Sequence, residues 1–361
     1  MTDPIKLVVV GTGLVGKRHV TAINRSKHVA LAGLVEPGPE GNSYAAGLSV
    51  PNFASIDEMF AALSPDGVVI STPTPLHVQH GLECISRNCP VLVEKPLAVT
   101  ADEAKVLRDA AIRSDVPLLV GHHRRHNPLI QKAAAMIAAG AIGDIRALQA
   151  TCWFYKPDDY FDIAPWRKLK GAGPISVNLV HDIDLIRYLC GEIVSVQAQA
   201  APSRRGFENE DVAAAVLQFD TGAIGTITVS DSVVSPWSWE LTSGEYPIYP
   251  VTSQSCYLLG GTEGALSLPD LTHWSHQGER SWWNPISATN TPRANSDPLV
   301  NQIEHFGQVI RGNVTPLISG EEGVRTMQVI EAIQSAAKTG KTIELPSLRV
   351  QGHTQGAVIA K

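Results

Sequence analysis

Short apolar runs alternate with amphipathic stretches over the first 120 residues of the chain. Ser55 with Glu58 and Thr100 with Glu103 have the spacing of capping boxes, which open two of the helical stretches. Strands that are separated by helices of this length pair in parallel through right-handed crossovers. The pattern therefore predicts a doubly wound α/β domain over residues 1–121. The runs that predict its buried strands are residues 5–10, 29–35, 67–71, 91–93 and 117–120.

The pattern changes after Gly121. A helical stretch begins at Asn127-Pro128, and strand-like runs then follow, interrupted by one apolar helical stretch at Ile175–Cys190. Long strands with few helices are typical of an antiparallel sheet covered by helices on one face. These runs are residues 145–155, 193–200, 213–219 and 225–230.

Two further helical segments, 299–311 and 321–339, close the pattern, whereas residues 231–295 are rich in Ser, Pro and Trp and give no readable periodicity. We expect an α+β domain for substrate binding and oligomerisation over residues 122–345, followed by a tail at 346–361. The closing helices, within 299–339, either stay in this domain or pack back on the first one.

A glycine-rich loop follows the first predicted strand directly and opens a helix. Gly11 permits a tight turn, Gly13 lets the backbone approach a pyrophosphate at the helix N-terminus, and Gly16 allows close packing of helix on strand. Glu36 stands 20 positions after Gly16, at the end of the second strand. The whole loop is expected to contact the cofactor: Gly11, Thr12, Gly13, Leu14, Val15 and Gly16.

This fingerprint predicts a Rossmann domain that binds a dinucleotide. The Glu36 carboxylate would accept hydrogen bonds from the adenosine ribose and repel a 2′-phosphate, which favours NAD over NADP. The alternatives are a tight turn without a ligand and, for Glu36, a solvated loop acid.

Composition narrows the class of protein. The chain has 29 Lys and Arg against 35 Asp and Glu, a net charge of −6, and no Lys/Arg run longer than two, which gives no support for a nucleic-acid partner. No run of 18 apolar residues predicts a membrane span, and the first ten residues do not have the pattern of a signal peptide. We expect a cytoplasmic protein whose five scattered cysteines stay reduced and mostly pack in the interior.

Four segments carry a resemblance to a known family. VLVEKP at 91–96, STPTPLH at 71–77, GHHRRHNP at 121–128 and the glycine- and histidine-containing stretch at 171–191, with the glycine loop, resemble the Gfo/Idh/MocA oxidoreductases. That family includes glucose–fructose oxidoreductase and inositol dehydrogenases, and the resemblance covers nearly all of the chain except 231–295. It implies two domains, a C-terminal sheet whose open face is often buried in dimers or tetramers, and sugars, polyols and related hydroxy compounds as substrates.

Lys95 is the strongest single candidate for catalysis. It comes just after a buried strand, at the carboxyl edge of a parallel sheet, where ligands bind in such folds. There its ammonium can orient a substrate hydroxyl, and partial desolvation would lower its pKa so that it can share a proton. The resemblance implies that this lysine acts beside the nicotinamide; the alternative is a surface lysine before a turn proline. The resemblance also places other residues near the cofactor: Ser71, Thr72, Thr74, His77 and Glu94.

His181 is the second catalytic candidate. If Ile175–Cys190 is helical, Asn178 and His181 lie three residues apart on one face, and a histidine suits acid–base work because its pKa is near neutrality. Many members of the resembled family have an Asp four residues before this His, whereas this chain has Val177. Asn178 can orient a substrate hydroxyl but cannot accept a proton, so proton transfer would fall to His181 and Lys95. The alternative is a histidine satisfied in the core.

Other candidates have two open interpretations each. His123 and Arg124 belong to a cationic cluster that either holds a substrate carboxylate or cofactor phosphate, or forms an exposed hinge. Trp166 and Arg167 are similar to a pair that contacts cofactor or substrate in the family. Asp182 and Asp184 have a metal-like spacing, but no further residue supports a metal, and we expect buried structural carboxylates. Five tryptophans either stack on sugar faces or, as we favour, serve packing and interfaces: Trp237, Trp239, Trp274, Trp282 and Trp283.

The sequence thus predicts an NAD-dependent dehydrogenase that oxidises a secondary alcohol of a sugar, polyol or sugar acid, with Lys95 and His181 as acid–base residues. An open apolar sheet face invites association, so we expect a homo-oligomer, either a dimer or a tetramer. Two other functions stay open: a redox-neutral enzyme for hydrolysis, elimination or isomerisation with retained NAD, and a non-catalytic NAD-binding regulator.

Overall fold

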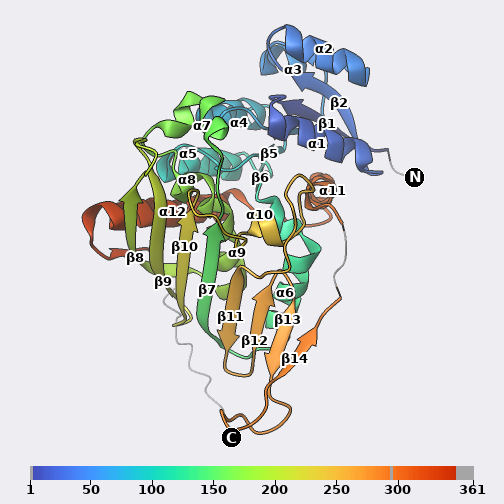
Figure 1. Ribbon diagram of the computed structural model, residues 1–361. Coiled ribbons are helices and arrows are strands. Elements are labelled where there is room, and N and C mark those ends of the chain that lie inside the picture. Colours follow the sequence, from blue (N-terminus) through green and yellow to red (C-terminus); the bar gives the residue numbers. More distant parts are fainter. Residues whose placement is uncertain (1–2, 293–295, 347–361) are drawn as a thin grey trace, which may run out of the picture.

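The computed structural model describes residues 3–292 and 296–346, so nearly all of the expected tail at 346–361 lies outside the described residues. Figure 1 shows a parallel sheet with helices on both faces, next to a larger sheet that carries its helices on one face. The predicted fold class, a Rossmann domain joined to an α+β part with a large and mainly antiparallel open sheet, is confirmed.

The first sheet has six parallel strands in the order β3-β2-β1-β4-β5-β6. Its interior strands are apolar and buried on both faces, as the continuous apolar runs predict. Both predicted capping boxes form, because Ser55 and Thr100 each accept a hydrogen bond from the backbone N–H three residues later, at 3.2 Å. The strands are β1 (Ile5–Val10), β2 (Val29–Val35), β3 (Asn52–Phe53), β4 (Gly67–Ile70), β5 (Val91–Val93) and β6 (Leu118–Val120). The helices are α1 (Leu14–Arg25), α2 (Pro39–Leu48), α3 (Ile56–Ala62), the 3₁₀ turn η1 (Thr74–Leu76), α4 (His77–Ile85) and α5 (Ala101–Arg113).

The second sheet has nine strands in the order β14-β13-β12-β11-β7-β10-β9-β8-β15. All neighbouring strands are antiparallel except β10 and β7, which are parallel. The strands are β7 (Ile145–Trp153), β8 (Ile193–Pro202), β9 (Glu210–Phe219), β10 (Ile224–Ser230), β11 (Tyr257–Gly261), β12 (Ala265–Leu268), β13 (Thr272–Ser275), β14 (Ser287–Asn290) and β15 (Ile343–Glu344). The helices and 3₁₀ turns are η2 (His123–His126), α6 (Pro128–Ala138), α7 (Asp158–Asp162), η3 (Pro165–Lys168), α8 (Pro174–Val177), α9 (Leu179–Cys190), α10 (Trp239–Thr242), α11 (Pro298–Ile310) and α12 (Gly320–Thr339).

The single helix expected at Ile175–Cys190 is divided in two at Asn178. This residue has φ −104° and ψ −53°, and it separates α8 from α9. Its side chain accepts a hydrogen bond from Lys156, so a tertiary contact holds the residue at the break. The apolar periodicity of the segment could not show this contact.

The closing helices connect the two sheets. Leu299, Ile303 and Phe306 of α11 share a core with β1 and α1, while α12 contacts α5 and β6 on one side and β8 and α9 on the other. Figure 1 shows α11 beside α1. Because these helices bury apolar surface against both sheets, they hold the two parts of the chain in a fixed relation.

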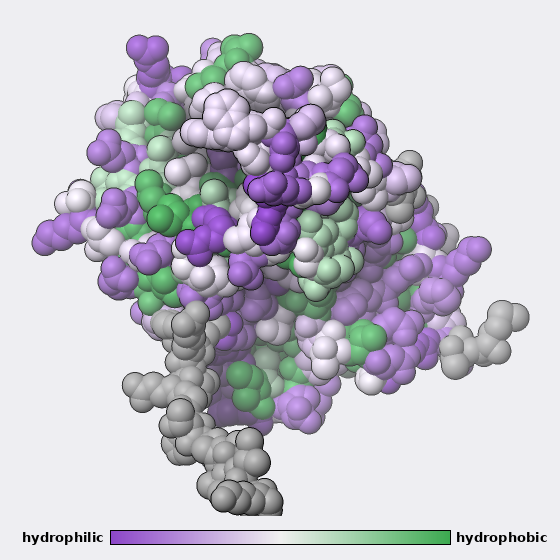
Figure 2. All heavy atoms as spheres, turned by 90° about the horizontal axis from the view of Figure 1, so that it is seen from below, coloured by the Kyte–Doolittle hydropathy of each residue, from purple (hydrophilic) through white to green (hydrophobic). Residues whose placement is uncertain are grey.

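The uncovered face of the large sheet carries several apolar side chains. Val216, Ile224 and Leu258 on this face are about half exposed. Trp282 and Trp283 lie in the loop that joins β13 to β14, not in the sheet, and are 88% and 83% exposed. Seen from below, hydrophobic residues form separate patches among hydrophilic ones (Figure 2). Trp239, in contrast, is fully buried, so the tryptophans do not share one role.

The five cysteines are buried and unpaired, as expected for reduced packing residues. Among the helices that the structure describes, none has the length and apolar character needed to cross a membrane.

Candidate active site

The two catalytic candidates come from different parts of the fold and meet at the carboxyl edge of the parallel sheet. Lys95 follows β5 directly, η2 follows β6, and His181 lies in the first turn of α9. The ring of His181 packs edge-on against His122 and His123, at centroid distances of 6.0 and 5.4 Å. The positive charge of Lys95 also acts on the pKa of His181. The structure therefore brings the two predicted residues into one site.

The glycine loop has the shape that a dinucleotide requires. Gly11 has φ +89°, and a Cβ there would lie 2.8 Å from the backbone of Ser71; at Gly16 it would lie 1.9 Å from the Gly11 carbonyl oxygen. A Cβ at Gly13 would meet open space. The N-terminus of α1 has no side-chain cap and no acidic residue in its first turn. The loop thus leaves free backbone N–H groups at a positive helix end, which fits the pyrophosphate of NAD(P).

Glu36 lies at the end of β2, where the sequence places it. One carboxylate oxygen accepts hydrogen bonds from the backbone N–H and the hydroxyl of Thr12, at 2.5 and 3.0 Å. The acid therefore lies against the glycine loop, beside the place where the adenosine ribose of a bound dinucleotide would lie.

The other predicted cofactor residues support the loops at this edge. The Ser71 hydroxyl donates to the Gly11 carbonyl at 2.8 Å, and the buried His77 ring lies 2.8 Å from the Pro96 carbonyl and 2.9 Å from the Thr72 carbonyl. Thr74 lies in η1. His77 thus joins the segment after β4 to the segment after β5, and the peptide bond between Lys95 and Pro96 is cis.

Glu94 is buried and held in its charged form. One oxygen lies 2.7 Å from the His19 ring, and the other accepts from the Lys95 backbone N–H at 3.1 Å. Burial would raise the pKa of Glu94, but the hydrogen bond and charge of His19 outweigh it and lower this pKa to about 2.

Burial dominates the electrostatics of Lys95. Desolvation and the charge of Arg124 lower the pKa of Lys95 to about 8, although the negative charge of Glu94 favours the charged form of the lysine. In the part of the chain that the structure describes, its ammonium has no hydrogen-bond or ion-pair partner. A desolvated ammonium without a partner is prepared to bind an oxygen atom of a ligand.

His181 is held neutral. Burial, and then the positive charges of Lys95 and Arg124, lower its pKa well below the usual value, and its Nδ1 atom is buried without a hydrogen-bond partner within the described residues. A neutral imidazole near a free ammonium can accept a proton or a hydrogen bond from a bound hydroxyl.

Lys156 also belongs to this site, although it was not among the residues predicted from the sequence. Its Nζ atom donates to Asn178 Oδ1 at 2.8 Å and lies 3.4 Å from Asp231 Oδ2, and its charge lowers the pKa of Lys95. Lys156 is 7% exposed. Its one signal in the sequence was its position, a lysine immediately after the strand-like run 145–155.

The expectation for the cationic cluster after β6 needs correction. Arg124 is buried and bonds Glu240 at 2.6 Å, with Asp182 at 3.5 Å, while His123 lies 2.8 Å from Glu245. The cluster is therefore not an exposed hinge, and the paired guanidinium is not a free clamp for a carboxylate or phosphate. The reason is that η2 packs against α6, α9 and α11, where burying a cation requires internal partners.

The two acids after His181 are such partners. Asp182 bonds the Tyr257 hydroxyl and faces Arg124, and Asp184 makes a bidentate pair with Arg125 at 2.7 and 2.9 Å. Burial raises the pKa of Asp182 to about 6, with Arg124 opposing the shift and Glu240 adding to it. Both acids are thus buried structural carboxylates, as expected from the sequence.

Arg125 provides a direct test of this buried ion network. Its guanidinium, which is 3% exposed, joins Asp184 to Glu322 of α12. We expect Arg125→Met to destabilise the protein by about 3–5 kcal/mol, because removing one partner leaves buried carboxylates uncompensated. Urea unfolding followed by circular dichroism checks this, with Arg113→Met, an exposed arginine at the end of α5, as the control. Equal stability of the two variants would contradict the assignment.

Trp166 and Arg167 lie in η3, at the rim of the site. Arg167 stacks on the ring of Tyr160, 3.9 Å from its centroid, and Lys156 approaches the same ring at 5.0 Å. Trp166 is 54% exposed. Arg167 and Lys156 thus contact the same ring, and Tyr160 connects η3 to the part of the site that contains Lys156.

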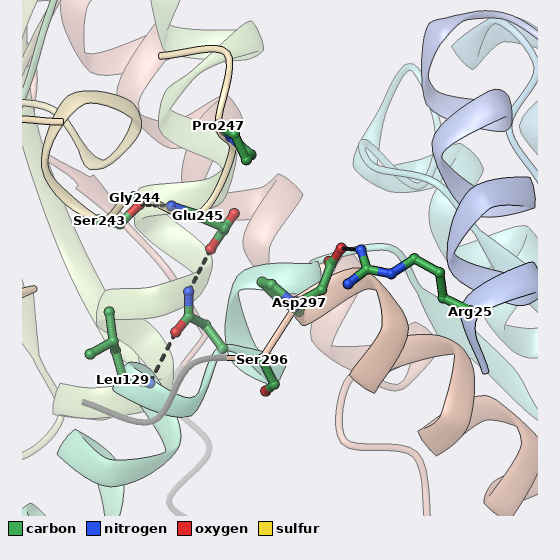
Figure 3. A pocket seen from close by; sticks show the side chains of 10 residues that line it. Arg25, Leu129, Ser243, Gly244, Glu245, Pro247, Ser296 and Asp297 are labelled. Atoms are coloured by element: carbon green, nitrogen blue, oxygen red, sulfur yellow. Dashed lines mark hydrogen bonds and ion pairs between the residues drawn. The ribbon is translucent and has the colours of Figure 1, made fainter. Parts of the chain in front are cut away.

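A cavity of about 530 Å³ lies between α1, the loop at residues 243–247 and the start of α11. Figure 3 shows the Asn127–Glu245 hydrogen bond, 2.8 Å long, on one wall and the Arg25–Asp297 ion pair, 2.7 Å long, on the other. Lys95 and His181 do not line this cavity. It adjoins the site through Glu245, which also bonds His123.

A Rossmann domain with an open glycine loop, and with a lysine and a histidine near its sheet edge, has the features of an NAD(P)-binding oxidoreductase. A family model described as "Oxidoreductase family, NAD-binding Rossmann fold" matches residues 5–122, and the "GFO/IDH/MocA C-terminal domain" matches residues 130–267. The chain belongs to the Gfo/Idh/MocA oxidoreductase family.

Three similar proteins illustrate the family. The rhizopine catabolism protein MocA of Rhizobium meliloti is 32% identical over 52% of this chain and 57% of its own length. D-xylose 1-dehydrogenase (NADP(+)) 2 of Haloferax volcanii is 26% identical over 93% of this chain and 98% of its own. The WlbA dehydrogenase of Bordetella pertussis, solved with NADH and UDP-GlcNAcA, has a TM-score of 0.77 and 24% identity, covering 96% of this chain and all of that one.

Proposed function

We propose that this oxidoreductase is an NAD-dependent dehydrogenase that oxidises a secondary alcohol of a sugar, polyol or sugar acid. The observation that carries the proposal is a pair of side chains at the sheet edge beside the glycine loop: the neutral His181 and the desolvated Lys95 ammonium, which has no partner among the described residues. The names of the relatives support the substrate class, because one of them is a dehydrogenase of a free sugar.

The residues of the chain divide the chemistry between them. The glycine loop and Glu36 would hold NAD, which, when bound, accepts the hydride from the alcohol carbon. Lys95 binds the oxygen of that alcohol and stabilises the negative charge that develops on it. Neutral His181, or Lys95 in its amine form, accepts the hydroxyl proton. Asn178 orients a neighbouring oxygen of the substrate.

The test is a panel of sugars, inositols and sugar acids incubated with purified protein and NAD⁺, with NADH absorbance as the readout. Turnover of at least one member supports the proposal. Net conversion of a sugar derivative without NADH accumulation, by protein that retains its cofactor through purification, would instead identify the redox-neutral enzyme. Cofactor binding without conversion of any member would identify the non-catalytic regulator.

We predict that the protein binds NAD(H) at least about 10-fold more tightly than NADP(H), because juxtaposed like charges cost several kcal/mol and Glu36 would face the 2′-phosphate. Calorimetric titration with both cofactors checks this. Glu36→Gln should narrow the difference, and Glu40→Gln, an exposed acid on α2, should leave it unchanged. Equal or tighter binding of NADP(H) by the unmodified protein would refute the prediction.

We also propose a homo-oligomer that covers the open face of the nine-stranded sheet. The half-exposed Val216, Ile224 and Leu258 on that face are the supporting observation. Light scattering at micromolar concentration should give the mass of a dimer or tetramer, and Val216→Lys should shift it toward the monomer. A monomeric mass for the unmodified protein would exclude this assembly.

The five unpaired cysteines suit a reducing compartment, and we place the protein in the cytoplasm. Fractionation of the cells that express it, with detection by antibody, tests this placement.

A further inference from the structure

Asn178 presents a fixed orientation to the site. An ammonium has only donors, so the Asn178 atom 2.8 Å from Lys156 Nζ is the acceptor Oδ1. The amide NH₂, which has no partner among the residues that the structure describes, is then left to donate elsewhere. Lys156 thereby occupies one lone pair of the Asn178 oxygen and leaves the NH₂ group available as a donor.

The neighbours of Asn178 are donors as well. Lys156 directs N–H groups at Asn178 and Asp231, which leaves its third N–H, near the rings of Tyr160 and Phe154, for a ligand. The Lys95 ammonium has no partner in the described part of the chain. The position one residue before Asn178, where many relatives carry a carboxylate, is the apolar Val177. This wall of the site therefore offers hydrogen-bond donors and little to accept a proton from a substrate hydroxyl.

The nearest carboxylate does not neutralise this wall completely. Asp231 is 3% exposed, and it serves both Lys156, at 3.4 Å, and Arg205, at 3.1 Å. Glu210 is the next acid on this side; burial raises its pKa, and its carboxylate accepts from the Ile175 backbone N–H. Glu240, on the other side, is committed to Arg124 at 2.6 Å. Lys156 thus shares its counter-ion, Asp231, with Arg205.

From this arrangement we infer that Lys156 and Asn178 form a subsite for a carboxylate of the substrate. A carboxylate is an acceptor with no proton to donate, so it suits a wall made mainly of donors, whereas a hydroxyl there would have few acceptors for its own proton. The inference rests on the proposed function and narrows it: the substrate is a sugar acid, whose alcohol faces Lys95 and His181 while its carboxylate faces Lys156.

The experiment measures binding separately from turnover. Protein saturated with NADH is titrated by calorimetry with matched acid and neutral pairs: D-gluconate and D-glucitol, D-glucuronate and D-glucose, D-galactarate and galactitol. We expect the acid of at least one pair to bind about 10-fold or more tightly than its neutral partner, as charge-assisted hydrogen bonds allow. The absence of a preference for the acid in all three pairs would overturn the inference.

Two isosteric or near-isosteric variants assign the preference to this subsite. Asn178→Asp replaces the donors by an acceptor that Lys156 can pair with, so the fold is kept while the preference for the acid should fall by about 10-fold or more. Val177→Asp introduces a carboxylate beside the same wall and should act in the same direction. Asn313→Asp, at an exposed position after α11, is the control for an added negative charge. Unchanged acid preference in both Asp variants would refute the assignment.

The outcomes also separate the inference from the proposed function. Selective acid binding that is lost in Asn178→Asp, without NADH formation from that acid and NAD⁺, would leave the subsite established and reject the dehydrogenase. Oxidation of neutral members with no acid preference would establish the dehydrogenase and reject the subsite.

Discussion

Lys95→Ala is expected to lower kcat by about 10²- to 10⁴-fold, the range found for removal of a positioned acid–base group. The lysine lies at the carboxyl edge of the Rossmann sheet, and its ammonium is desolvated and has no partner among residues 3–292 and 296–346. Nothing else in the described site supplies a second unpaired cation, because Arg124 and Lys156 are both bonded to neighbours. The alanine variant therefore loses the group that binds the reacting oxygen.

The pH dependence of the reaction identifies the protonation state that Lys95 needs. Burial lowers its pKa to about 8, so the amine form becomes populated as the pH rises through 8. If Lys95 accepts the alcohol proton, kcat/KM for alcohol oxidation rises with pH through that value and levels off above it. Steady-state kinetics between pH 6 and about 10 measures the profile, and Lys95→Ala should abolish the rise.

Lys105→Ala, on the exposed surface of α5, is the control for these measurements and should keep both the rate and the profile. A Lys95→Ala enzyme with nearly full kcat and an unchanged profile would show that another group performs the proton transfer.

The fold was predictable to the extent that it is encoded locally. The apolar runs of β1, β2, β4 and β5 and the capping boxes of α3 and α5 each depend on a few adjacent residues, and each appears where the sequence placed it. Strand β3 was not predicted, because two residues are too few to show a periodicity of apolar positions. The strands within residues 231–295 were not predicted, because each is only four or five residues long and depends on pairing with another strand. For example, β11 pairs with the distant β7.

Site residues could be predicted where the chemistry of a single side chain and its position near a sheet edge point to a role. Lys95 and His181 were proposed in this way, and in the structure the charge of Lys95 acts on His181. Arg124 was misjudged because its partners, Glu240 and Asp182, lie 116 and 58 positions away in the chain. Lys156 was missed for the same reason, since its contact with Asn178 exists only in the folded protein.

His181→Ala is expected to lower kcat by a similar factor of about 10²- to 10⁴-fold, but for a different reason. The imidazole is neutral because burial and the charges of Lys95 and Arg124 lower its pKa well below the usual value. It can therefore accept a proton or a hydrogen bond from the substrate hydroxyl throughout the range in which the enzyme is assayed. Its removal should reduce the rate at every pH and leave unchanged any rise near pH 8 that comes from Lys95. Position 177 is valine, so no carboxylate there shares the task.

Three measurements distinguish loss of a proton acceptor from loss of structure in this variant. His181→Gln keeps a hydrogen-bonding side chain that cannot accept the proton, so it should lose about as much kcat as His181→Ala does. NAD⁺ affinity, measured by calorimetry, should change little in either variant, because His181 lies on α9 and the glycine loop lies before α1. His28→Ala, an exposed histidine before β2, serves as the matched control. A kcat for His181→Ala close to that of the control would mean that the proton leaves through Lys95 alone.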